Sequence, residues 1–418
     1  MDMTDVLTML GSPEGRANPY PLYAALHEIG EVVQVAPGQT VQVGPGTPLQ
    51  ASLGELLVVG YDAINSVLRD PGFRVSDANR FDETRPEWRA EPIFIQSADW
   101  ILNLDAPRHQ QIRSLIARAF TGRRIARLEP AIITMADELL DAMADRGADG
   151  SAVEFMHDFA FLLPVTVICE LIGIPEADRE GFRPLARDLS SVFEASDAQS
   201  LHTINAAATE LLAYFTGLAA QRRADPRDDL ISDLLAVSDS GSGKLTGAEL
   251  LHNLTLLLIA GFETTTNMLG NGMHIVLQNP PSGAALMDGS VPPSAFVEEV
   301  LRFDSPIQLT ARIGYDTKIG CVPVSPGMEV AILLGAGNRD PRRFTAPDRF
   351  DPMRPNGGPL SFGAGAHFCI GAALARLEGA VAFPRLLNRF PRIVAAGEPI
   401  RRDRLVVRGF DEMPVTVV

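Results

Sequence analysis

A single cysteine framed by glycines constrains this chain more than any other feature. Residues 362–371 read Phe-Gly-Ala-Gly-Ala-His-Phe-Cys-Ile-Gly. Glycines allow a tight turn in which successive amide N–H groups point at the sulfur of Cys369 and favour its thiolate. A helix-forming run follows over residues 370–378, and its N-terminal dipole is expected to lower the thiol pKa further. The segment predicts a metal-bound sulfur under a flat cofactor, which Gly371 lets approach closely. The alternative is a buried cysteine that only packs.

The chain as a whole reads as one domain. Its 418 residues are 46% hydrophobic, enough for a large core, and no linker of distinct composition divides them. We therefore expect a single domain over residues 1–418. The net charge of −16 argues against nucleic acid and anionic membranes as partners, because both carry negative charge.

Neither a membrane anchor nor a secretion signal is evident. The longest apolar stretch, residues 254–262, falls far short of the ~20 residues that span a bilayer. The N-terminal residues lack the basic and apolar regions of a signal peptide, so the sequence predicts a cytoplasmic protein without membrane contact. Cys169 and Cys321 are too widely separated to indicate a disulfide framework or a zinc site, and we expect them to be inert.

Apolar residues recur every three or four positions between about residues 122 and 279, which predicts a mainly helical chain. The longest predicted helix runs over about residues 247–279, where Thr246 and Glu249 form a capping box. Shorter strand-like runs lie at residues 56–59, 330–334 and 405–407. The sequence therefore predicts a mainly α fold with a smaller β-rich portion.

The sequence Ala-Gly-Phe-Glu-Thr-Thr-Thr at residues 260–266 interrupts this long helix with a glycine, an acid and three β-branched residues. Local rules tend to be broken at functional sites. The hydroxyl of Thr264 can bond the carbonyl of Ala260 one turn earlier and open a small groove in the helix. A purely structural, threonine-kinked helix with a surface Glu263 is the alternative.

Both segments resemble motifs of the cytochrome P-450 family of haem-thiolate monooxygenases. The loop matches Phe-Gly-x-Gly-x-His-x-Cys-x-Gly, and the helix matches Ala/Gly-Gly-x-Asp/Glu-Thr. The resemblance extends from about Asn18 to the end of the chain. It implies the cytochrome P-450 fold and a haem b whose iron has Cys369 as its axial ligand. It also implies that Thr264 hydrogen-bonds dioxygen, the co-substrate, and that Glu263 helps to deliver protons.

The same resemblance assigns supporting residues. Glu299 and Arg302 lie three apart on one helical face, a spacing that usually marks a surface salt bridge. The resemblance instead implies a buried network, completed by Arg349, that supports the cysteine loop. It also implies that two histidines and two arginines bind the haem propionates. The residues assigned to the haem site are His109, Arg113, Arg312 and His367 for the propionates, with Ala260, Gly261, Phe362, Gly363, Cys369 and Gly371.

By this resemblance the chain hydroxylates or epoxidises a bulky hydrophobic molecule, because its similarity is greatest to actinobacterial enzymes of macrolide and other polyketide tailoring. A steroid, a terpene or a carrier-bound amino acid is the alternative substrate. A peroxide-driven peroxygenase and a non-catalytic haem sensor are rivals that Glu263 and Thr264 argue against. Segments matching the variable pocket walls of the family contain the candidate substrate contacts Phe94, Ile95, Trp100, Phe193, Ile307, Leu309 and Phe410.

No flavin or nicotinamide segment follows the cysteine loop. We therefore expect a monomer that receives electrons from NAD(P)H through a ferredoxin reductase and an acidic ferredoxin. An ordinary solvated arginine face is the alternative reading of the residues that would contact the ferredoxin. These candidate contacts are Arg118, Arg123, Arg124 and Arg376.

Overall fold

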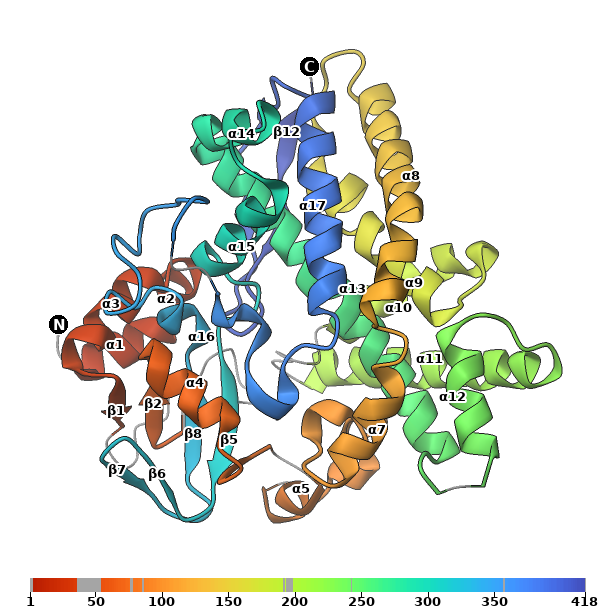
Figure 1. The fold of residues 1–418 in the computed structure, drawn as a ribbon, viewed down its shortest axis with the longest axis vertical. Helices are drawn as coiled ribbons and strands as arrows, with labels where there is room; N and C mark the ends of the chain where they lie inside the picture. The colour runs from red at the N-terminus through yellow and green to blue at the C-terminus, as the bar shows by residue number, and fades with distance from the viewer. Residues whose placement is uncertain are drawn as a thin grey trace.

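The computed structural model describes residues 3–35, 54–75, 78–84, 86–190, 192, 198–241, 243–355 and 358–417. Helices make up most of it, and the main sheet lies to one side, at the lower left of Figure 1. This arrangement confirms the predicted mainly α fold with a smaller β-rich portion. Over these residues, no helix has both the length and the apolar character needed to cross a membrane.

The longest helices lie between residues 122 and 389. The α-helices are α1 (Met3–Leu10), α2 (Pro13–Ala17), α3 (Tyr20–Ile29), α4 (Tyr61–Arg69), α5 (Ala78–Thr84), α6 (Pro92–Ala98), α7 (Arg108–Ile116), α8 (Gly122–Arg146), α9 (Leu162–Ile172), α10 (Arg179–Ser190), α11 (Ala198–Ala224), α12 (Leu230–Asp239), α13 (Gly247–Gln278), α14 (Pro280–Met287), α15 (Pro293–Phe303), α16 (Leu334–Gly337) and α17 (Ala372–Arg389). The 3-10 turns η2 (Ile101–Asn103) and η7 (Gly365–His367) lie near the candidate site.

The main sheet has the strand order β1-β2-β8-β5-β3, in which β2 and β8 are parallel and the other neighbours antiparallel. The predicted strand at 405–407 is wrong, because Val407 forms only an isolated bridge with Ile307 and no ladder extends from it. The main-sheet strands are β1 (Val32–Gln34), β2 (Leu56–Val58), β8 (Glu329–Ile332), β5 (Thr310–Gly314) and β3 (Phe73–Arg74). The smaller sheets are β4 (Val153–Glu154), β12 (Pro414–Thr416) and β9 (Val394–Ala395); β10 (Ile400–Arg401) and β11 (Phe410–Glu412); β6 (Thr317–Ile319) and β7 (Val322–Val324).

The main sheet packs a hydrophobic core on each face. Alternate residues of β2 point to opposite faces, so Leu57 packs with α1 and α3, whereas Leu56 packs with α4. The core beside α4 also contains Leu360 and Ala364. These two residues flank the start of the cysteine loop. Because they share this core with residues of β2 and β8, the loop packs against one face of the main sheet.

The long helix α13 begins where the sequence predicts. The side chain of Thr246 accepts a hydrogen bond from the amide of Glu249, and the Glu249 carboxylate accepts one from the Thr246 amide. This confirms the capping box. The helix ends at Gln278 after 32 residues, or about 48 Å at 1.5 Å per residue, so it crosses the helical part of the molecule.

Two glycines let neighbouring helices approach α13 closely. A Cβ on Gly261 would lie 2.7 Å from Ile168 in α9, and a Cβ on Gly272 would lie 2.2 Å from Phe383 in α17. Close helix packing therefore requires both glycines. Gly261, which the resemblance assigns to the haem site, is therefore also required for the packing of α9 against α13.

A buried carboxylate in α15 holds the chain that precedes the cysteine loop. Arg302 donates to both oxygens of Glu299 at 2.7 Å, and it also donates to the carbonyl of Asn338 at 2.9 Å. The second guanidinium beside Glu299 belongs to Arg354, whose Nε lies 3.6 Å from Oε1. The implied buried network is therefore present.

The prediction that Arg349 supplies the second guanidinium is wrong. The side chain of Arg349 is exposed, and only its carbonyl joins the network, where it accepts from Arg302 at 3.1 Å. Arg349 lies in a turn in which its amide donates to the carbonyl of Ala346. The side chain that lies beside Glu299 is that of Arg354, five residues further along the chain.

We expect Arg302→Leu to lower the free energy of unfolding by about 3 to 5 kcal/mol, because the buried Glu299 carboxylate loses both hydrogen bonds from Arg302 and keeps the more distant guanidinium of Arg354 at 3.6 Å. Arg349→Leu should change it by no more than about 0.5 kcal/mol, since that side chain is exposed. Urea unfolding of both holoproteins, followed by circular dichroism, measures the difference. Equal losses in the two variants would contradict this assignment.

Candidate active site

The cysteine loop adopts the predicted tight turn. Gly363 and Gly365 have φ angles of 66° and 68°, and the amide of Cys369 donates to the carbonyl of Phe362 at 2.9 Å. A Cβ on Gly365 would lie 2.2 Å from the carbonyl oxygen of Leu68, so this glycine also lets the loop sit against the end of α4. The loop is fixed both by its own turn and by a neighbouring helix.

The sulfur of Cys369 lies on a recessed surface. The residue is accessible to solvent, yet desolvation by the surrounding protein raises the pKa of its thiol. The amides of Gly371 and Ala372, together with Arg113 and Arg376, offset this rise only in part. The expected net lowering of the thiol pKa is therefore wrong for the protein alone, because burial outweighs the helix start. A thiolate here requires a positive partner such as a metal ion.

Four basic side chains from separate segments come together near the loop. The rings of His109 and His367 lie 4.2 Å apart between centroids. Burial, with the nearby guanidinium groups of Arg113 and Arg312, lowers the pKa of His109 to about 4 and that of His367 to about 3. Burial also lowers the pKa of Arg312 to about 10, which Asp105 only partly offsets. Within the part of the chain that the structure describes, Nε2 of His109 is buried and has no hydrogen-bond partner. An anionic ligand would relieve this accumulation of positive charge.

The predicted hydrogen bond between Thr264 and Ala260 is present in α13. Oγ1 of Thr264 donates to the carbonyl of Ala260 at 3.0 Å. Ala260 is exposed and Thr264 is half-buried, although most flanking residues of the helix are buried. Because the two residues lie one turn apart, they open on the same side of the helix. We call this accessible surface of Ala260 and Thr264 the α13 strip.

Glu263 lies on a neighbouring side of α13 and is already paired. Its buried carboxylate forms an ion pair with Arg402 and accepts a hydrogen bond from Asn267 at 3.4 Å. Nε of Arg402 also bonds Asp411 at 3.0 Å. Successive helical residues differ by about 100°, so Glu263 does not share the α13 strip. Glu263 therefore has an ion-pair partner, Arg402, which no sequence motif indicated.

The candidate substrate contacts fall into different environments. Phe410 is buried against the ring of His274, 4.8 Å away between centroids. Since His274 follows Glu263 by about three helical turns, Phe410 covers that side of α13 rather than the side of Thr264. This corrects its predicted place beside the reacting centre. Of the others, Phe94, Trp100 and Leu309 are buried, Ile95 is exposed, Ile307 is half-buried, and Phe193 lies outside the described residues.

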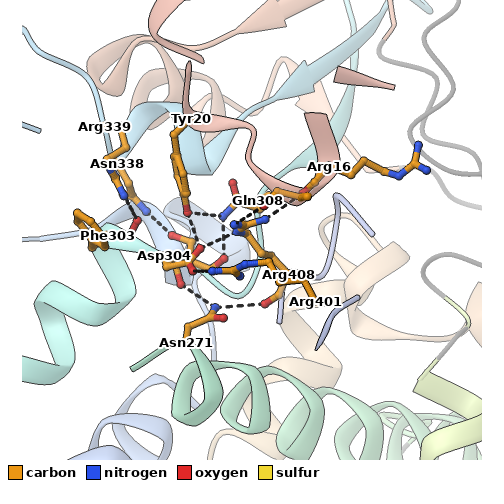
Figure 2. Close-up of polar contacts among 12 residues, drawn as sticks. Arg16, Tyr20, Asn271, Phe303, Asp304, Gln308, Asn338, Arg339, Arg401 and Arg408 are labelled. Atoms are coloured by element: carbon orange, nitrogen blue, oxygen red, sulfur yellow. Dashed lines mark hydrogen bonds and ion pairs between the residues drawn. The ribbon is translucent and has the colours of Figure 1, made fainter. Parts of the chain in front are cut away.

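A second buried carboxylate, Asp304, joins distant parts of the chain (Figure 2). Its oxygens accept hydrogen bonds from Tyr20 at 2.6 Å, Arg408 at 2.7 Å and Arg401 at 3.1 Å. Asn271 of α13 donates to its backbone carbonyl at 2.9 Å. Burial would raise the pKa of Asp304, but Arg408 and Arg401 hold it well below its ordinary value. A surface cavity of about 820 Å³ adjoins this cluster, and its lining comes from α3, α13 and the end of α15 rather than from the cysteine loop. The sequence motifs did not indicate this cluster.

Comparisons with known proteins agree with this geometry. A family model described as cytochrome P-450 matches residues 294–407. The chain is 37% identical over 404 residues to the cytochrome P-450 monooxygenase PikC of Streptomyces venezuelae, with 96% of this chain and 91% of that protein covered. It is 35% identical over 369 residues to 6-deoxyerythronolide B hydroxylase of Saccharopolyspora erythraea, with 86% of this chain and 89% of that protein covered.

A solved structure is similar over almost the same length. The crystal structure of P450BioI in complex with an acyl carrier protein ligated to hexadec-9Z-enoic acid matches with a TM-score of 0.86 and 34% identity, covering 97% of this chain and 100% of that chain. Together with the cysteine loop and the bond from Thr264 to Ala260, this similarity shows that the chain belongs to the cytochrome P-450 family of haem-thiolate monooxygenases.

Proposed function

We propose that this monooxygenase, acting as a single monomeric domain, hydroxylates or epoxidises a bulky hydrophobic molecule of polyketide or macrolide type in secondary-metabolite biosynthesis. The observation that carries the proposal is the α13 strip, where the Thr264 hydroxyl is accessible in the mainly buried middle of the helix. The name of the similar 6-deoxyerythronolide B hydroxylase supports the substrate class. The apolar candidate contacts Phe94, Trp100 and Leu309 suit a ligand held mainly by burial of surface.

The residues of the site fit a haem b. Cys369 would supply the thiolate, Arg113 and Arg312 would supply cations for two propionates, and His109 and His367 would supply hydrogen-bond donors. The fit is supported by Nε2 of His109, which is buried and has no hydrogen-bond partner among the described residues, and by the two nearby guanidinium groups of Arg113 and Arg312. When bound, the haem supplies the activation of dioxygen and the insertion of one oxygen atom into the substrate.

Two residues of α13 would handle protons. The hydroxyl of Thr264 now donates to the carbonyl of Ala260, and rotation about χ1 lets it donate to a reactant in the α13 strip instead. Glu263 can exchange a proton only when its pairing with Arg402 opens. Arg402 keeps a second carboxylate partner, Asp411, so it can release Glu263 without becoming unpaired.

A steroid, a terpene or a carrier-bound amino acid is the alternative substrate. The similar P450BioI structure holds an acyl carrier protein, which favours the carrier-bound class among these. A peroxygenase and a non-catalytic haem sensor are disfavoured, because Thr264 occupies the accessible strip and Glu263 has a partner that can release it.

Electrons would come from NAD(P)H through a ferredoxin reductase and a ferredoxin. Of the four candidate arginines, Arg118 and Arg123 are exposed, whereas Arg124 and Arg376 are held in ion pairs with carboxylates. Paired arginines offer less net charge to a partner. The proposed contact surface therefore centres on Arg118 and Arg123.

We expect Arg312→Leu to speed haem loss by at least about tenfold, because a charge-assisted hydrogen bond contributes about 1.5 to 3 kcal/mol. Arg312→Lys should retain most of the affinity, since it keeps the charge. Transfer of haem to excess apomyoglobin measures the rate by absorbance. An unchanged rate in Arg312→Leu would remove this residue from the propionate site.

Thr264→Ala should uncouple the enzyme rather than stop it, because the hydroxyl guides protons without carrying electrons. With a reductase system and a compound that binds beside the haem, NAD(P)H consumption should continue while hydrogen peroxide accumulates and product per electron pair falls. Thr265→Ala is the matched control, since its buried hydroxyl bonds the carbonyl of Gly261 at 3.3 Å on another side of the helix. Equal coupling in the two variants would refute the role given to Thr264.

Reduction by the ferredoxin should slow as salt increases, because the screening length falls from about 10 Å at 0.1 M to about 3 Å at 1 M. Arg118→Glu should raise the apparent KM for ferredoxin while haem content stays the same. Arg392→Glu, an exposed change beyond the far end of α17, is the control. Salt-independent reduction measured by stopped flow would count against the arginine surface.

A further inference from the structure

One buried asparagine of α13 ties down the segment that leads into the propionate cluster. Asn253 is 1% exposed, and its Nδ2 donates to the carbonyl of Asp99 at 2.8 Å. Its Oδ1 accepts from the amide of Ile101 at 2.9 Å. Nδ2 also donates to the carbonyl of Glu249 at 2.8 Å within α13. Both polar groups of this side chain are therefore used, and they hold the backbone on both sides of Trp100.

Other polar contacts hold the same segment, residues 91–103, which we call the α6 wall. Next to Asn253, Nδ1 of His252 lies 2.8 Å from Oδ2 of Asp99. On the opposite edge, the amide of Ile93 donates to Asn205 of α11 at 3.0 Å, and Gln96 donates to the carbonyl of Ala208 at 3.0 Å. The α6 wall is thus held between α11 and α13.

The position of Asn253 on its helix connects this tie to the reacting centre. Asn253 precedes Thr264 by eleven residues, about three turns and about 16 Å along the helix axis. Leu257 and Ala260 fall between them on the same side. The α6 wall, which contains Phe94 and Trp100, is therefore fixed to the side of α13 that opens at Thr264.

The residue type is informative, because asparagine is a poor helix former and a buried amide costs free energy unless it is hydrogen-bonded. Residues 254–259 are Leu-Thr-Leu-Leu-Leu-Ile, so a leucine would suit the local helix better. Asn253 instead provides a hydrogen-bond donor for the carbonyl of Asp99 and an acceptor for the amide of Ile101.

We propose that Asn253 is a positioning residue that fixes the α6 wall and so sets which bulky molecules fit beside Thr264. The proposal rests on the proposed function only in taking the space beside Thr264 as the substrate site. When the α6 wall is already fixed, a bulky ligand can contact it without the entropic cost of ordering that segment. When the wall is not fixed, this cost lowers the affinity for the ligand. A small ligand that does not reach the wall should be unaffected.

The chain provides a matched control in Asn271. This residue is also fully buried in α13, and its Nδ2 donates to the carbonyls of Asp304 at 2.9 Å and Arg408 at 3.2 Å (Figure 2). It therefore ties the same helix to a remote segment through its amide donor, and these hydrogen bonds go to Asp304 and Arg408 rather than to the α6 wall. A purely structural effect of losing a buried asparagine should appear equally in both variants.

The experiment compares Asn253→Leu and Asn271→Leu holoenzymes with the unsubstituted protein. Binding of imidazole and of the bulky imidazole clotrimazole is followed by the Soret shift. Asn253→Leu should weaken clotrimazole binding by about three- to tenfold and leave imidazole binding unchanged, which corresponds to the loss of one or two hydrogen bonds. Asn271→Leu should leave the ratio of the two dissociation constants unchanged.

Hydrogen exchange without any azole gives an independent readout. Peptides from residues 91–103 should exchange at least about tenfold faster in Asn253→Leu, and at the ordinary rate in Asn271→Leu. If Asn253→Leu does not yield folded holoenzyme, Asn253→Ala removes the same bonds without added bulk. Unchanged exchange, or an equal change of the azole ratio in both variants, would overturn the proposal. Failure of imidazole to shift the Soret band would instead contradict the haem assignment.

Discussion

The structure depends on close packing around α13. Helices α9 and α17 approach it at Gly261 and Gly272, where an added Cβ would come within 3 Å of a neighbouring side chain. Because neighbours cover most of the helix, the accessible surface in its middle lies at Ala260 and Thr264, with Gly261 half-buried between them. Packing therefore decides where a reactant can meet the helix. Near the start of the helix, the polar tie of Asn253 lies between the buried apolar residues Leu250 and Leu254.

Buried charges determine how the peripheral segments meet this helical core. Glu299 and Arg302 hold the chain before the cysteine loop, and Asp304 gathers Tyr20 and Arg408 from opposite ends of the sequence. Ion pairs of this kind contribute little net stability, because desolvation offsets the attraction between the charges. Their value lies in specificity, since any other arrangement of these segments would leave a charge buried without a partner.

The electrostatics of the site are unfavourable in the protein alone. Burial raises the pKa of Cys369, and burial with nearby arginines lowers the pKa of His109 and His367. In our proposal the iron offsets the first effect and the propionates offset the second. Haem binding would then stabilise the fold by linkage, because the ligand binds the folded chain and not the unfolded one. The protein holds a site whose charges are balanced only when the cofactor is bound.

Local interactions were determined by the sequence itself. The bond from Thr264 to Ala260 and the turn of the cysteine loop depend on residues a few positions apart, so spacing and residue type suffice to predict them. Partners far apart in the sequence were decided only by the tertiary structure. Arg354 rather than Arg349 lies beside the buried carboxylate of α15, and Arg402 pairs with the buried carboxylate of Glu263 in α13. The physical reason is that many arginines have the charge for each pairing, and only the packed chain decides which of them arrives within reach.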